Sequence, residues 1–298
     1  MGTIRPREER LTAGVLIMIA AVTCFTGIDT SAKWLSLYGL PVMQIVFVRY
    51  AMHFALSVAF FVPREGLSAF RSNVPKKQLL RSAALMLSTF MNFWALSYLP
   101  LSLTISIAFA TPMVVTLLAI PLLGEKVGLR RIAAVITGFV GVLIVVQPWG
   151  VGFHWAVILS LHTLVFASFY YVMTRMIAGE EANSTMQLWS SGLATLALFP
   201  LAAQNWVWPH DSAGWIVMGL IGTFGMLGHV FVTTANRFAD ASVLSPMIYT
   251  QLISATIVGY IVFGSLPTWW TLIGATIIIG SGLYIWNRER VTQGVTPT

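Results

Sequence analysis

Ten long apolar stretches, separated by short polar connections, make up most of the chain. A helix needs about 20 largely apolar residues to cross the hydrocarbon core of a bilayer. The stretches lack the strict alternation of barrel strands, and backbone polar groups must pair internally in lipid, so we expect helices. The predicted spans are residues 12–33, 41–62, 79–98, 101–123, 131–147, 153–177, 185–204, 213–235, 241–263 and 270–286. The pattern therefore predicts an all-α integral membrane protein with ten transmembrane helices.

The composition supports this class. Apolar residues make up 57% of the chain and charged residues only 9%, against roughly 25% charged residues in a soluble domain. The single Cys24 excludes a disulfide framework and offers no metal cluster. The net charge of +7 is spread over short connections, so we expect contact with an anionic lipid surface and no nucleic-acid partner.

The distribution of basic residues predicts the orientation. If the amino terminus lies in the cytoplasm, all of the 17 Lys and Arg except Lys33 and Arg49 fall in cytoplasmic segments or at their span ends. Basic residues near span ends are retained on the cytoplasmic side. We therefore expect a bacterial inner-membrane protein with both termini in the cytoplasm.

The second half of the chain repeats the outline of the first. Residues 95–146 form an apolar run, a polar break and a second apolar run, and residues 235–286, shifted by 140 positions, do the same. Five spans per half is an odd number, so the second half must enter the membrane from the opposite side. We thus predict two inverted five-helix repeats, residues 1–148 and 149–298, with a substrate site near the midplane between them. Pro112 and Pro246 predict kinks in the fourth and ninth spans.

Several of these segments resemble the EamA branch of the drug/metabolite transporter superfamily. The resemblance is most specific in residues 242–252 (SVLSPMIYTQL), with Phe263-Gly264, residues 267–270 and residues 274–284 after them, and in Pro112 and Leu123-Gly124-Glu125 of the first half. It implies ten helices in two inverted halves, a central cavity, and movement of small organic solutes, frequently amino acids or related metabolites and often outward. One departure is Gly264-Ser265, where the family often carries Gly-Glu, which weakens any symmetric role for the glutamate.

Asp29 is the only acidic residue within a predicted span, and Lys33 follows it at the next turn of the same helix. Their spacing allows an ion pair. One interpretation is a lysine that reaches the outer interface with a local counter-ion. The other is a pair that gates the outer mouth, with Asp29 as a proton site.

Arg49 lies about 12 Å past Pro41 on the second span, near the middle of the bilayer, and His53 follows one turn later. A guanidinium there is suited to hold a substrate carboxylate through paired hydrogen bonds. The alternative is a structural partner for Asp29 or for helix-end carbonyls. We assign Arg49 and His53 to the predicted substrate site.

Six further residues complete the predicted substrate site. Most tryptophans lie at span ends, where an interfacial belt accounts for them. Polar side chains inside spans also serve as packing hydrogen-bond partners, and a lone membrane histidine is more often a packing residue than a proton relay. The six residues are Asn92, Trp94, His162, Trp189, Tyr249 and Gln251.

The leading functional hypothesis is a secondary transporter of small organic metabolites, with amino acids or related compounds as substrates and export as the direction. We expect alternating access, with proton coupling through Asp29 or exchange of substrates. No Walker A motif is present and no cofactor is expected. The alternatives are an intramembrane enzyme, for which HExxH and GxSxG are both missing, and a membrane receptor or scaffold.

Overall fold

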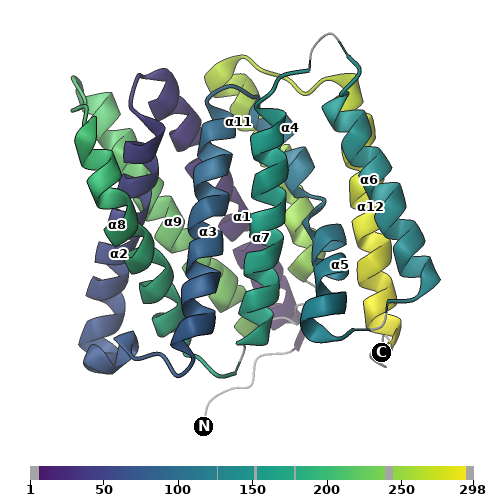
Figure 1. Cartoon of the computed structure of the whole chain (residues 1–298), viewed down its shortest axis with the longest axis horizontal. Helices are drawn as coiled ribbons and strands as arrows, with labels where there is room; N and C mark the ends of the chain where they lie inside the picture. The colour runs from purple at the N-terminus through teal and green to yellow at the C-terminus, as the bar shows by residue number, and fades with distance from the viewer. Residues whose placement is uncertain (1–6, 126, 151–152, 178, 239–243, 293–298) are drawn as a thin grey trace.

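The structure is a computed structural model that describes residues 7–125, 127–150, 153–177, 179–238 and 244–292. The described residues fold into a single bundle of helices (Figure 1). The elements are α1 (Arg7–Leu37), α2 (Val42–Glu65), η1 (Gly66–Phe70), α3 (Pro75–Leu96), α4 (Leu101–Ala108), α5 (Thr111–Leu123), α6 (Leu129–Val146), α7 (Val157–Met176), α8 (Asn183–Gln204), α9 (Ser212–Phe238), η2 (Ser245–Thr250), α11 (Gln251–Phe263) and α12 (Trp269–Thr292).

The ten predicted spans are confirmed. Ten helical segments are long and apolar enough to cross a membrane. Their bounds differ from the prediction mainly at polar ends: α3 begins at Pro75 rather than near residue 79, because a proline favours the first turn of a helix. The first three residues of the predicted ninth span, 241–243, lie outside the described residues.

The fourth and ninth spans are each made of two pieces, as the prolines predict. The fourth is split into α4 and α5, with Pro112 in the first turn of α5. The ninth begins as the 3-10 helix η2, which contains Pro246, and continues as α11. Proline lacks the backbone N–H that would continue the hydrogen-bond ladder, so both spans change helical geometry inside the bundle.

The two halves end these split spans in the same way. Gly124 after α5 and Gly264 after α11 adopt left-handed backbone conformations, with φ of 68° and 62°. The next residue donates its backbone N–H back into each helix, from Glu125 to Ala119 O at 3.2 Å and from Ser265 to Gly259 O at 3.0 Å. This termination requires glycine at the first position and only a backbone N–H at the second. The change from glutamate to serine therefore leaves the helix end intact.

The helix pairing follows an inverted repeat. The first helix of each half packs along the third span of the other, α1 on α9 and α7 on α3, while α2 packs on α8 and α6 on α12. Within the last pair, Ser281 Oγ donates to Ala134 O. Shifted by 140 positions, these residues correspond to Gly141 and Gly274, which form the tightest approach of the same two helices. The crossing thus repeats its own contact about a two-fold axis, as two inverted five-helix halves require.

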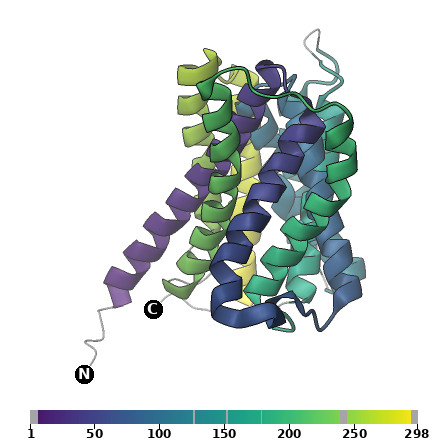
Figure 2. The ribbon, with the colours of Figure 1, turned by 90° about the vertical axis from the view of Figure 1, so that its left-hand side faces the viewer.

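Both chain ends point to one end of the bundle (Figure 1). We call this the terminus end; it holds the connection between α2 and α3 and the one between α7 and α8. The opposite end, where α2 begins, is the far end. Figure 2 shows α1 leaning away from the other helices as it approaches the terminus end.

Candidate substrate site

Arg49 and His53 lie one turn apart on α2 and are buried in the bundle. Their side chains are 4% and 3% exposed. Nε and Nη1 of Arg49 and Nδ1 of His53 have no hydrogen-bond partner among the described residues. Nor does a described carboxylate lie within 4.0 Å of Arg49, whose guanidinium instead sits 4.0 Å from the centre of the Tyr50 ring. The expected direct ion pair with Asp29 is therefore not formed.

The helix α9 faces this pair with Gly225 and His229, also one turn apart. The imidazole rings of His229 and His53 stack with centroids 5.4 Å apart. A Cβ placed on Gly225 would lie 3.8 Å from Nε of Arg49 and 3.9 Å from Nδ1 of His53. We call Arg49, His53, Gly225 and His229 the cationic cluster.

The other glycines of α9 let it approach its neighbours. A Cβ on Gly222 would lie 2.3 Å from Met52 of α2, and one on Gly228 would lie 2.6 Å from Phe25 of α1. These two glycines have the close-packing role that the sequence predicted. Gly219 meets nothing within 4 Å, and Gly225 faces the cationic cluster.

Asp29 and Lys33 have separate partners, so the ion pair that their spacing allows is not formed. Asp29 Oδ1 accepts a hydrogen bond from Asn92 Nδ2 at 2.8 Å, and its carboxylate interacts electrostatically with Arg49. Lys33 is buried and donates from Nζ to the carbonyls of Leu96 and Leu99, at 3.0 and 2.7 Å. These carbonyls lie at the end of α3, where a cation is favoured. Lys33 therefore secures α1 to α3, whereas Asp29 and Asn92 border the cationic cluster.

Arg81 of α3 is a second buried arginine that the sequence analysis placed among the cytoplasmic basic residues. It is 5% exposed, and all three guanidinium nitrogens donate hydrogen bonds. The acceptors are Thr174 Oγ1, Met186 O, Ser190 Oγ and Tyr170 Oη. Arg81 thus joins α3 to α7 and α8.

Three of the remaining predicted site residues lie away from the cationic cluster. His162 is exposed on α7, where Nδ1 lies 2.8 Å from Ile158 O of its own helix. Trp189 donates from Nε1 to Phe70 O at the end of η1. The Tyr249 ring packs edge-on against Phe109, beside the break between α4 and α5. The role of these residues in binding stays a prediction, as does that of Gln251, the first residue of α11.

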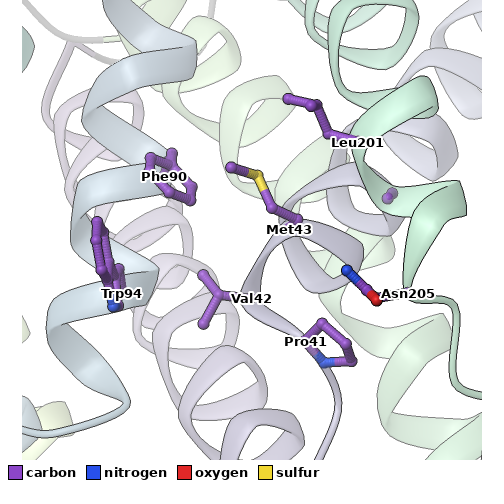
Figure 3. A pocket seen from close by; sticks show the side chains of 8 residues that line it. Pro41, Val42, Met43, Phe90, Trp94, Leu201 and Asn205 are labelled. Carbon is purple, nitrogen blue, oxygen red and sulfur yellow. The ribbon is translucent and has the colours of Figure 1, made fainter.

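Trp94 lines a groove of about 320 Å³ at the far end, between α2, α3 and α8 (Figure 3). Phe90 and Trp94 form one wall, and Val42 and Met43 at the start of α2 form another. The wall is mostly apolar, with Asn205 as a polar group. Arg49 lies about 9 Å farther along α2 than Met43. The groove offers aromatic surface for a flat ring.

Polar contacts close the bundle at the far end. Tyr38 Oη donates to Asp211 Oδ1 at 2.9 Å, and Gly214 N donates to the same oxygen at 2.8 Å. The Gly214 hydrogen bond, with that from Tyr38, lowers the pKa of the Asp211 carboxyl. Gln44 exchanges two hydrogen bonds with the backbone of Val207, at 2.7 and 2.9 Å.

The terminus end is closed by contacts between the two halves. Glu181 accepts hydrogen bonds from Ser72 Oγ and from Val74 N. Glu180 pairs with Lys77 at 3.2 Å, and its backbone oxygen accepts from Asn73. We call these contacts between residues 72–77 and residues 180–181 the latch.

Comparison with known families identifies the chain. The model of the EamA-like transporter family matches it twice, at residues 12–147 and 154–287. The chain belongs to the EamA-like transporter family. It is a membrane transporter of small metabolites, which excludes the alternatives of an intramembrane enzyme and a receptor.

Curated relatives of this EamA-family chain carry different metabolites. It is 28% identical over 282 residues to a riboflavin transporter of Vibrio cholerae, covering 93% of each chain. It is 24% identical to an S-adenosylmethionine uptake transporter of Rickettsia prowazekii, over 88% of each chain, and 25% identical to a pseudopaline exporter of Pseudomonas aeruginosa, over 91% of this chain and 95% of the other. A solved crystal structure aligns with a TM-score of 0.62 at 18% identity, over 95% of this chain and 99% of that one, which shows a shared fold.

Proposed function

We propose that this EamA-family protein carries a heteroaromatic metabolite of the riboflavin class across the bacterial inner membrane by alternating access. The observation that carries the proposal is the cationic cluster, whose buried donors suit the carbonyl and ring acceptors of such a molecule. Riboflavin transporters from three bacterial species match the chain at 27–28% identity over at least 93% of its length. The aromatic groove at the far end adds a surface for a flat ring.

The amino-acid substrates expected from the sequence are the second candidate. Arg49 is suited to a carboxylate as well as to a carbonyl group. Export stays a prediction, because the relatives include both an uptake transporter and an exporter.

We place the terminus end in the cytoplasm. The Lys and Arg of the connections between α2 and α3 and between α5 and α6 support this orientation. Asp29 is the group proposed for proton coupling, since it borders the cationic cluster and has a neutral partner in Asn92. Exchange of one substrate for another is the alternative to proton coupling.

Flux into proteoliposomes tests the proposal. We expect the purified chain to move riboflavin saturably, and Arg49→Ala to reduce kcat/KM by about tenfold or more through loss of hydrogen bonds from a charged donor. Gly219→Ala on α9 is the matched control, because its added methyl meets nothing within 4 Å. Saturable flux of amino acids without flux of riboflavin would replace the first candidate with the second.

A further inference from the structure

The donors of the cationic cluster converge on one point of α9. Nε of Arg49 and Nδ1 of His53 both lie within 3.9 Å of the position that a Gly225 Cβ would occupy. Both nitrogens are buried and have no partner among the described residues. Burying a charged donor without an acceptor is unfavourable, so such an arrangement is retained where a ligand supplies the acceptor.

We infer that Arg49, His53 and the Gly225 face of α9 form a subsite for an sp² oxygen of the substrate, with Gly225 as a specificity-determining residue. This deepens the proposed function and rests on it for the route of the ligand. A guanidinium donates to a carboxylate or to a ring carbonyl, and a neutral imidazole adds a donor or an acceptor. The ligand class is therefore a carboxylate or a pyrimidinedione edge, such as the one that the riboflavin ring carries.

Gly225 leaves room for this oxygen. Gly222 and Gly228 on either side are in contact with Met52 and Phe25, but the space above Gly225 is bordered by polar nitrogens and, at 4.0 Å, by Ile28 Cδ1. An alanine methyl at this position makes ordinary van der Waals contacts with its neighbours, so Gly225→Ala should fold. The methyl would occupy the place of the ligand oxygen and shield both donors.

Melting of the full-length protein in detergent tests the subsite without an identified substrate. The probes are formate, which carries only a carboxylate, and uracil, which carries only the pyrimidinedione edge. We expect at least one probe to raise the melting temperature saturably, because binding to the folded state stabilises it by mass action. The half-saturating concentration should rise about tenfold or more in Gly225→Ala, and the response should vanish in Arg49→Gln.

Gly219→Ala on the same helix should respond like the wild type, because its methyl meets nothing within 4 Å. An equal response of Gly225→Ala and the wild type, a response that persists in Arg49→Gln, or no response to either probe would overturn the subsite. A response to formate alone assigns the carboxylate, and a response to uracil assigns the ring carbonyl. A normal probe response without any riboflavin flux would overturn the proposed substrate and leave the subsite standing.

Discussion

Two arginines are buried in the first half of the chain, and their hydrogen bonding differs. Arg81 has an acceptor for each guanidinium nitrogen, whereas two guanidinium nitrogens of Arg49 have none among the described residues. We expect Arg81→Met to lower the free energy of unfolding by more than about 3 kcal/mol, since several charge-assisted hydrogen bonds are lost. Arg49→Met should leave it unchanged or raise it, because an uncompensated buried charge is removed.

Thermal or SDS-induced unfolding of the two variants measures this difference, and riboflavin flux measures its counterpart. Arg49→Met should retain the fold and lose transport. Equal destabilisation by both substitutions would show that Arg49 is a structural residue like Arg81.

Asp211 predicts a pH effect at the far end. Its pKa is lowered from 3.8 by the hydrogen bonds from Gly214 N and Tyr38 Oη. A carboxyl with a lowered pKa in the folded state stabilises that state above its unfolded pKa, and the stabilisation disappears as the pH falls through the folded value. We expect the wild type to melt above Asp211→Asn at pH 6 and the difference to close below pH 3.8. A difference that is constant with pH would exclude the ionised carboxylate as its source.

At the residue scale, the sequence identified where buried polar groups occur but not what they contact. The spacing of Asp29 and Lys33 correctly predicts a shared helix face, yet Lys33 bonds to carbonyls 63 and 66 residues away. His229 was interpreted as a packing residue, and its contact with His53 depends on how α9 crosses α2. Local patterns carry no information about such crossings, so the cationic cluster was only half predictable.

Helix crossings give the prediction at the element scale. Where α6 and α12 cross, a Cβ on Gly274 would lie 2.6 Å from Gly141 O, which is a backbone atom that cannot turn aside. We expect Gly274→Ala to force the two helices apart and to lower the free energy of unfolding by about 1–3 kcal/mol. Gly280→Ala on the same helix is the control, because nothing lies within 4 Å of its added methyl. A Gly274→Ala protein that melts with the wild type would contradict this close crossing.

At the same scale, the sequence predicted most of the architecture. Span length and hydropathy are local properties, and a proline interrupts a helix wherever it lies, so the ten spans and the two split spans followed directly. The matching ends at Gly124 and Gly264 were visible only as one identity among few. Their shared backbone geometry is a stronger sign of duplication than the residue identities, because glycine is required by the left-handed conformation and the following side chain is not.

The whole molecule is held at its terminus end by the latch, which joins the first half to the second. Glu181 accepts hydrogen bonds from Ser72 and from the backbone of Val74. Removing a charged acceptor costs about 1.5–3 kcal/mol per hydrogen bond, enough to shift a two-state equilibrium about tenfold or more. We therefore expect Glu181→Ala to favour a state that is open at this end. Ser57 lies on α2 one turn beyond His53 toward the latch, and it is 0% exposed, so it reports this opening.

The measurement uses Ser57→Cys in a chain whose only native cysteine is replaced by Cys24→Ser. A membrane-impermeant maleimide added to the terminus end should label this cysteine slowly, and about tenfold faster or more when Glu181→Ala is added. Lys76→Ala, an exposed side chain at the same end, should leave the rate unchanged. Faster labelling in Glu181→Ala with retained melting temperature means that the latch sets the balance between the two open states of the transporter. An unchanged rate would mean that contacts deeper in the bundle, such as those of Arg81, hold the terminus end closed without the latch.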